Sequence, residues 1–262
     1  DVCLALYPGD LKVAAIIPAR FGSSRLPGKP LALIGGVPMV VRVWQAAVGS
    51  GVFDEVLVAT DHPDIAAVVL DAGGRVAMTR VDHLTGTDRC AEAATLFAGR
   101  QGDPESEMAI VNIQGDEPFI DPAHLAALAD ALKGEGPPIA TLCRAPRPGE
   151  LEAPQRVVAL PEKGAGKIVL ARNFTRAADP DPGAKIHIGL YGFRAGVLPE
   201  LALLEATEGE KRERLEQLRW LENGYGIQLI EVQNPLEPPA VDTEEDLDVA
   251  QKWWDKMHGT MS

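Results

Sequence analysis

Apolar residues in the first half of the chain follow two alternating patterns. Short continuous apolar runs are typical of strands buried on both faces of a parallel sheet, and they lie at Lys12–Pro18, Glu55–Thr60, Arg75–Thr79, Met108–Ile113 and Ile139–Cys143. Between them, apolar residues at helical spacing predict helices from Met39, from His62-Pro63 to Gly73-Gly74, over Thr87–Ala98 and over Pro122–Leu132. This alternation predicts an α/β fold with a mainly parallel sheet and helices on both faces.

The pattern changes from about Arg144. Short candidate strands then stand among loops rich in Pro and Gly, at Arg156–Leu160, Lys167–Ala171 and His187–Arg194. They predict a smaller β-rich lobe. A charged helix over Glu210–Glu222, ended by Asn223-Gly224, is expected to follow.

A strand at Ile227–Val232 and a final helix from Thr243 complete the predicted elements. No internal repeat or low-complexity segment divides the chain. We therefore expect a single domain over residues 12–262, in which residues 12–143 and 225–262 form the core and residues 144–224 form the β-rich lobe.

Composition and charge narrow the possible functions. The 262 residues are 46% apolar and 24% charged, as in ordinary globular proteins. The net charge of −13 argues against nucleic-acid binding, which depends on Lys and Arg, and no apolar run reaches the ~18 residues of a membrane helix. The cysteines, Cys3, Cys90 and Cys143, have no CxxC spacing, so neither a disulfide framework nor a zinc site is expected and a reducing cytoplasm is predicted.

An anionic small substrate needs basic residues gathered in one place, and the loop after the first strand gathers them. Its cations are Arg20, Arg25 and Lys29. Gly22, Ser23 and Ser24 allow backbone N–H groups to approach an anion. Ligands of open parallel sheets bind at the carboxyl ends of the strands, so the loop is a candidate phosphate site. It has neither the GxGxxG nor the GxxxxGK[ST] pattern, and the alternative is a solvated basic loop.

Two carboxylates are candidate metal ligands. Asp116 follows the fourth strand, and Mg²⁺ prefers one or two carboxylates together with phosphate oxygens and water. Asp242 precedes the last helix, where Thr243 and Asp246 can form a capping box. Alternatively, Asp116 belongs to an ordinary strand-to-helix turn and Asp242 only flanks a helix.

Two further patterns carry less information. The Thr and Gly residues of Thr79–Arg89 are able to read a base and a ribose, although their spacing alone is a weak signal. A serine hydrolase is not supported, because GxSxG is absent and the five histidines lie near no convincing nucleophile. His187 lies inside an apolar strand and by itself is more typical of a core residue.

Taken together and in order, these motifs resemble one family. PAR-x-x-S-x-RLPGKPL, ATD, T-x-x-DH-x-x-GTDR, VNIQGDEPFI, HIGLYGFR, LEQLR-x-LENG and VDTEEDL extend from about Lys12 to Trp254. This is similar to the 3-deoxy-manno-octulosonate (Kdo) cytidylyltransferases. The resemblance implies a nucleotide-diphospho-sugar transferase-like fold, Mg²⁺ dependence, a cytoplasmic homodimer, and CMP transfer from CTP to a ulosonic sugar acid in lipopolysaccharide biosynthesis. It also implies that the core binds the nucleotide, while the lobe binds the sugar and forms the dimer.

The resemblance assigns roles to matching residues. The phosphates of CTP are expected to contact Arg20, Ser23 and Lys29. Cytosine and ribose are expected to be enclosed by Pro18, Ala19, Thr85, Gly86 and Thr87. The Mg²⁺ carboxylates match Asp116 and Asp242, which with Arg20 and Lys29 form the expected catalytic group. The sugar acid is expected to face Gln114, Arg172, His187, Tyr191, Glu216 and Gln217.

The departures from the family are concentrated in the lobe. The family's Asn-Pro-Asn-x-Val-Lys element is here residues 153–158, without the lysine, and residues 169–176 keep only the arginine, Arg172, of another element. CMP transfer is therefore the firmer expectation. A different 2-keto-3-deoxy acid, or a catalytically idle scaffold, remains an alternative to the Kdo enzyme, although both aspartates, Arg20 and Lys29 are retained.

Overall fold

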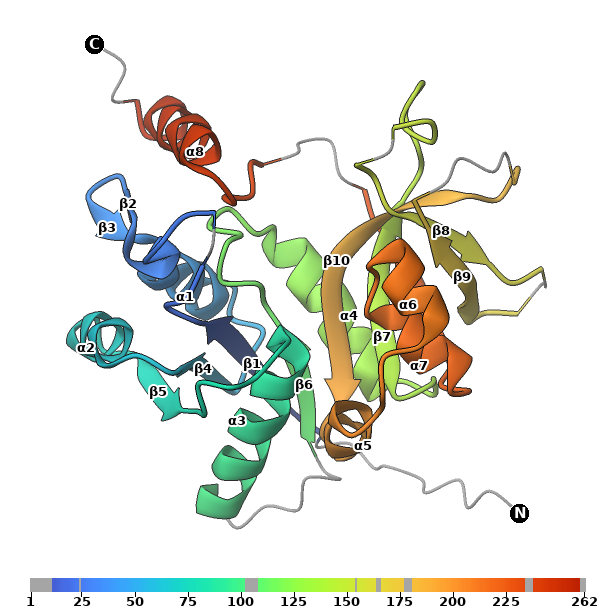
Figure 1. The fold of residues 1–262 in the computed structure, drawn as a ribbon, viewed down its shortest axis with the longest axis horizontal. Coiled ribbons are helices and arrows are strands. Elements are labelled where there is room, and N and C mark those ends of the chain that lie inside the picture. The colour runs from blue at the N-terminus through green and yellow to red at the C-terminus, as the bar shows by residue number, and fades with distance from the viewer. Residues whose placement is uncertain are drawn as a thin grey trace.

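One nine-stranded sheet runs through the part of the chain described by the computed structural model, residues 11–23, 25–101, 108–153, 155–163, 166–176, 181–233 and 238–259. Its strand order is β5-β4-β1-β6-β10-β7-β11-β9-β8 (Figure 1). The strands are β1 Lys12–Ala19, β4 Glu55–Thr60, β5 Arg75–Met78, β6 Met108–Asn112, β7 Ile139–Arg144, β8 Val158–Pro161, β9 Val169–Thr175, β10 Lys185–Arg194 and β11 Ile227–Glu231. A separate hairpin consists of β2 Leu33–Ile34 and β3 Val37–Pro38.

The helices cover both faces of this sheet. They are α1 Met39–Gly49, α2 Pro63–Asp71, α3 Gly86–Gln101, α4 Pro122–Lys133, α5 Leu198–Ala202, α6 Glu208–Glu213, α7 Gln217–Glu222 and α8 Glu244–Met257, with short 3₁₀ turns at Lys29–Leu31 and Ala195–Val197. One apolar cluster joins α3, α5 and α7 to one face of the sheet, and a second joins α1, α2 and α4 to the other. Alternate residues of β1 enter the two clusters, as the two-residue strand period requires. The predicted α/β fold is confirmed.

The predicted parallel pairing is also confirmed for most of the core. β1 pairs in parallel with β4 and β6, β4 with β5, and β7 with β11. The exception is β10, which lies between β6 and β7 and is antiparallel to both. Because β8 and β9 also join this sheet, the β-rich segment after β7 continues the core sheet and does not form a sheet of its own.

Among the elements of this segment, one strand and one helix show clear differences from the sequence prediction. The strand expected at Lys167–Ala171 is β9, Val169–Thr175, and the single helix expected over Glu210–Glu222 is two short helices. Arg214 lies between α6 and α7 in the left-handed region, with φ 57°. The break allows four successive residues of α7, 217–220, to be buried, whereas one straight surface helix buries a single stripe.

The last helix and the hairpin pack together outside the main sheet. Thr243 caps α8 and forms the predicted capping box with Asp246. Gly35 of the hairpin has φ 55° and lies against Trp254, leaving no room for a side chain there. Arg42 stacks on that indole, 3.6 Å from the ring centre, and its Nη2 donates to the Gly35 carbonyl at 2.9 Å. These contacts set the position of α8 and therefore of Asp242 at its start. Among the described residues, no helix is long and apolar enough to cross a membrane.

Candidate active site

A polar cavity of about 240 Å³ lies where β1 and β6 end side by side. Three loops and the start of α8 line it. The lining residues are Pro18, Ala19, Arg20, Ser23, Arg25, Lys29, Pro30, His83, Leu84, Thr85, Gly86, Arg89, Gln114, Gly115, Asp116 and Asp242. The structure thus brings together ten of the predicted residues, from loops that are far apart in the sequence. The predicted loop residue Ser24 lies outside the described residues.

Lys29 is the centre of the charged part of this cavity. Its ammonium group donates to Asp116 Oδ2 at 2.7 Å and to Asp242 Oδ1 at 3.1 Å. Arg25 Nη2 donates to the same Asp242 oxygen at 3.0 Å. The Lys29 side chain is only 15% exposed, so these charges interact where water screens them less than at the surface.

This arrangement suits a small divalent cation. Two carboxylate oxygens converge on one positive group, the Lys29 ammonium. Two carboxylates leave the remaining coordination positions of Mg²⁺ to phosphate oxygens and water, which is the set that Mg²⁺ prefers. Three or more His, Cys, Asp or Glu side chains grouped as for a metal ion are not found among the described residues. Asp116 and Asp242 therefore fit a metal that arrives with a nucleotide better than a resident metal.

Close approach of the backbone shapes the floor of the cavity. A Cβ atom on Gly115 would lie 2.8 Å from the carbonyl oxygen of Pro18, and one on Gly86 would lie 3.4 Å from the Pro18 ring. Only glycine at position 115 lets the chain after β6 lie against the end of β1. This contact keeps Asp116 beside the basic loop.

The turn before α3 forms the wall opposite the basic loop. Thr85 and Asp88 bond reciprocally, each side chain accepting from the other's backbone N–H at 3.1 Å. Thr87 is buried, and its hydroxyl donates to Glu216 Oε2 at 3.0 Å. The predicted base-reading turn therefore contributes Thr85 and Gly86 to the cavity wall, while Thr87 connects the turn to the predicted sugar residues.

The predicted sugar residues form a largely buried group next to this turn. Gln217 is 5% exposed, and burial raises the pKa of Glu216. The His187 and Tyr191 rings lie 5.4 Å apart, and burial lowers the pKa of His187 to about 3. The bulge in β10 adds two residues opposite β7, so the two rings stay on one face as their spacing predicts.

Tyr191 carries a buried hydroxyl that makes no hydrogen bond of ordinary geometry within the described residues. Its ring contacts the Trp220 ring edge-on and stacks on the Phe193 ring. The hydroxyl is therefore the polar end of a side chain that packs among aromatic rings. A buried donor without a partner costs free energy. A ligand oxygen at this place would remove that cost.

Arg172 is not brought into either group. It lies on β9, and its Nη2 donates to Asp181 Oδ2 at 2.7 Å. Its side chain is 48% exposed. The role in carboxylate binding that the family pattern assigns to it therefore stays a prediction.

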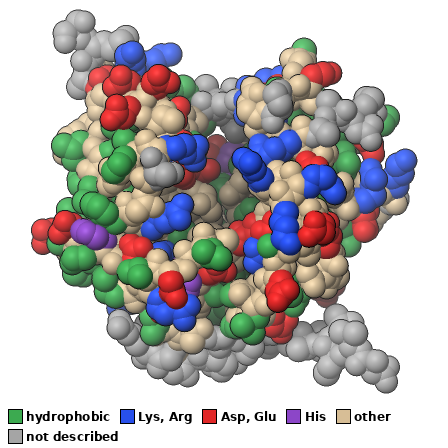
Figure 2. Space-filling model, viewed as in Figure 1, with side chains coloured by type: hydrophobic (Ala, Val, Ile, Leu, Met, Phe, Trp, Pro, Cys, Tyr) green, Lys and Arg blue, Asp and Glu red, His purple; other side chains and the backbone are tan. Residues whose placement is uncertain are grey.

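Lys and Arg side chains gather around a hollow on the face shown in Figure 2, between the two halves of the molecule. In a chain with a net charge of −13, this local excess of cations matches the need of an anionic substrate.

Comparison with known proteins agrees with this geometry. The Cytidylyltransferase family model matches residues 14–231. The chain is 41% identical to the 3-deoxy-manno-octulosonate cytidylyltransferase of Phocaeicola vulgatus, over 95% of this chain and 100% of the relative, and 43% identical to that of Methylorubrum extorquens, over 90% and 94%.

The chain belongs to the 3-deoxy-manno-octulosonate cytidylyltransferase family.

A solved member of this family has nearly the same fold. The structure of CMP:2-keto-3-deoxy-manno-octonic acid synthetase in complex with CTP superposes with a TM-score of 0.82 at 35% identity, and the match covers 95% of this chain and 100% of that one. The recognition made from the sequence motifs is therefore confirmed.

Sequence reasoning missed part of the site. Asp61 and Arg89 lie in the quoted ATD and GTDR motifs but were given no role, and Arg89 lines the cavity. Asp61 follows β4 directly, as Asp116 nearly follows β6. Ligands bind at the carboxyl ends of parallel strands. This rule, if applied to every core strand, would have indicated Asp61.

Proposed function

We propose that this chain transfers CMP from CTP to the anomeric hydroxyl of Kdo, releasing diphosphate and giving CMP-Kdo. The observation that carries the proposal is the convergence of Asp116 and Asp242 on Lys29, inside a cavity at the carboxyl ends of β1 and β6. Family membership and the likeness to a CTP complex support the same reaction.

Lys29 and Arg20 bind the triphosphate in this account. The Lys29 ammonium leaves its two carboxylates and donates to phosphate oxygens, and the Arg20 guanidinium neutralises charge from the mouth of the cavity. Asp116 and Asp242 would then hold Mg²⁺. When bound, Mg²⁺ supplies charge neutralisation on the phosphates and lowers the pKa of a coordinated hydroxyl.

The reaction forms one bond and breaks one. The anomeric oxygen attacks the α-phosphorus, the bond from this phosphorus to the β-phosphate oxygen breaks, and diphosphate leaves with that electron pair. The proton of the hydroxyl passes to solvent or to the phosphates. The residues contribute by positioning and by charge, and no covalent enzyme intermediate is needed.

The sugar acid lies between the nucleotide and the buried group in this account. Glu216, Gln217, His187, Tyr191 and Gln114 offer acceptors and donors for its hydroxyl groups. Thr87 connects them to the nucleotide turn through its bond to Glu216. We propose that Arg172 gives up its bond to Asp181 and pairs with the carboxylate of the sugar acid, because a bidentate contact is stronger.

We also infer that the enzyme is a cytoplasmic homodimer, with residues 144–224 in the interface and residues 12–143 and 225–262 binding the nucleotide. The family pattern supports this inference. Light scattering coupled to gel filtration measures the oligomeric state, and a monomer at the concentration of the assay would contradict it.

Diphosphate release tests the proposed reaction. The purified chain is assayed with Mg²⁺, each of the four nucleoside triphosphates, and a panel comprising Kdo, a sialic acid and an amino-substituted ulosonic acid. We expect kcat/KM to be highest for CTP with Kdo, and UTP to be at least about a hundredfold poorer, because a site that hydrogen-bonds its base rejects a base that leaves those groups unpaired.

The panel separates the alternatives. A higher kcat/KM for another ulosonic acid would change the assigned sugar while retaining CMP transfer. The departures from the family in segments 153–158 and 169–176 would then account for the different sugar. No turnover with any acid, together with tight CTP binding, would indicate the scaffold alternative.

A further inference from the structure

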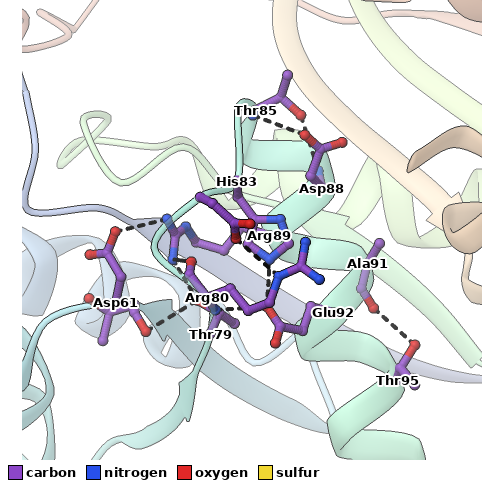
Figure 3. A network of polar contacts seen from close by, with 12 residues as sticks. Asp61, Thr79, Arg80, His83, Thr85, Asp88, Arg89, Ala91, Glu92 and Thr95 are labelled. Atoms are coloured by element: carbon purple, nitrogen blue, oxygen red, sulfur yellow. Dashed lines mark hydrogen bonds and ion pairs between the residues drawn. The ribbon is translucent and has the colours of Figure 1, made fainter. Parts of the chain in front are cut away.

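An ion pair at the edge of the cavity, which Arg89 lines, connects two loops that the nucleotide must contact together. Asp61 Oδ2 accepts from Arg89 Nη2 at 3.0 Å, and the two side chains are 11% and 3% exposed (Figure 3). Two buried charges at this distance remain stable only as a pair, because either one alone would be left unpaired in a medium of low dielectric constant.

Asp61 is attached to the basic loop by its other oxygen. Its Oδ1 accepts from the backbone N–H of Phe21 at 3.1 Å. The Phe21 carbonyl in turn accepts from the backbone N–H groups of Ser23 at 3.0 Å and Gly28 at 3.4 Å. The next residue, His62, stacks on the Phe21 ring with centroids 3.9 Å apart. The carboxylate after β4 therefore sets the position of the loop that carries Arg20 and Ser23.

Arg89 is attached to the opposite wall. It lies one turn into α3, and its Nη1 donates to Thr79 Oγ1 at 2.5 Å and to the Arg80 carbonyl at 3.2 Å (Figure 3). These bonds close the connection from β5 to α3, which contains Thr85 and Gly86. Arg89 thus sets where the N-terminus of α3, and the turn before it, lie relative to β5.

We propose that Asp61 and Arg89 form a positioning pair for the nucleotide: the pair holds the phosphate-binding loop and the base-binding turn at the separation that CTP spans, without contacting its reacting atoms. The proposal rests on the proposed CTP reaction. Binding both ends of CTP requires both walls at once, and the Asp61 carboxylate is bonded to each of them.

The test is Asp61→Asn in the full chain. Asn keeps an oxygen for the Phe21 N–H but removes the charge that holds Arg89. We expect the KM and the calorimetric Kd for CTP with Mg²⁺ to rise about tenfold to a hundredfold, since displacements near 1 Å cost this much in aligned sites. The KM for Kdo at saturating CTP is expected to rise less than the KM for CTP, because His187, Tyr191 and Gln217 lie on β10 and α7, away from the bonds that the pair makes.

A matched control separates positioning from general stability. Glu210 and Arg219 form another ion pair of low exposure, at 2.6 Å, which connects α6 to α7. Glu210→Gln is expected to lower the Tm as Asp61→Asn does, while the Kd for CTP stays within about twofold of the wild-type value.

The double variant Asp61→Asn/Arg89→Gln gives the decisive readout and also covers a single variant that folds poorly. It leaves no unpaired buried charge, so its Tm is expected to recover toward the wild-type value while the KM for CTP remains raised. Recovery of CTP affinity together with the Tm would reduce the pair to a stability role and overturn the proposal. An unchanged KM for CTP in Asp61→Asn would also overturn it, whereas a wild-type chain that does not use CTP would instead reject the proposed function.

Discussion

At the scale of single residues, the site is a set of charges held close together before any substrate arrives. Asp116 and Asp242 would repel each other if left alone, and the Lys29 ammonium between them neutralises part of their charge. In the proposed reaction, phosphate draws Lys29 away and releases the two carboxylates. The residues proposed to bind the ligand would thus be the ones that stabilise the site before it binds.

Replacing Asp242 with Asn removes one negative charge while keeping the shape of the side chain. We expect kcat to fall roughly a hundredfold or more, because metal catalysis contributes several kcal/mol, and the fold to persist. Initial rates over a Mg²⁺ titration measure the effect. Glu244→Gln makes the same change of charge at an exposed position two residues away and is expected to leave kcat unchanged. Wild-type turnover of Asp242→Asn at saturating Mg²⁺ would show that Asp242 only flanks the helix and does not bind the metal.

Tyr191→Phe separates binding from stability. The free protein is expected to gain about 1 kcal/mol in free energy of unfolding, because the substitution removes a buried hydroxyl that makes no hydrogen bond of ordinary geometry among the described residues. The KM for Kdo is expected to rise about tenfold if the hydroxyl bonds the sugar. Denaturant titration and steady-state kinetics measure the two effects. Tyr225→Phe, which removes an exposed hydroxyl bonded to Glu200, is the control for KM. A less stable Tyr191→Phe protein with an unchanged KM would contradict both parts.

At the scale of elements, α8 positions a proposed metal-binding carboxylate, Asp242, from outside the main sheet. Its capping box fixes the chain direction at Asp242, since Asp246 Oδ2 accepts from the backbone N–H of Asp242 and of Thr243 at 3.0 and 2.9 Å. Packing of Trp254 against Gly35 and Arg42 holds the rest of the helix. The position of the proposed metal ligand therefore depends on an ordinary helix terminus.

Thr243→Ala tests this dependence. Loss of the cap is expected to lower the free energy of unfolding by about 1 kcal/mol and to raise the Mg²⁺ concentration at half-maximal rate. Thr207→Ala removes the corresponding cap of α6, whose hydroxyl accepts from the Glu210 N–H at 3.4 Å, and should cost similar stability without changing the Mg²⁺ requirement. Equal Mg²⁺ requirements in the two variants would show that Asp242 needs no help from the cap.

Local pattern predicted the elements well where the pattern and the packing agree. The buried runs of β1, β4 and β6 and the capped start of α8 were all readable from the sequence. The break at Arg214 was not, because the charged segment around it has good helix formers and only its packing requires the left-handed residue. The place of β10 between β6 and β7 was also hidden, since strand order depends on contacts that a single sequence does not reveal.

At the scale of the whole molecule, the site is assembled from the ends of strands that are neighbours in space and distant in sequence. Asp116 and Asp242 were named from their motifs, and the strand-end rule explains why Asp116 meets Lys29. The strand-end rule points to Asp61, but its pairing with Arg89 could not be predicted, because the bonds that connect the pair to neighbouring loops use backbone groups that leave no sequence signal. The motif predicted Arg172 as a sugar-binding residue. It could not predict the bond to Asp181, which depends on how two chain segments approach each other.

The most direct test of cytidylyl transfer is a ³¹P NMR spectrum of the chain incubated with CTP, Kdo and Mg²⁺. We predict that the three CTP signals are replaced by one phosphodiester signal of CMP-Kdo and by diphosphate in equimolar amounts, and that Asp116→Asn leaves CTP intact over the same time. Inorganic phosphate with CDP, or loss of CTP without a phosphodiester signal, would contradict transfer of CMP at this site.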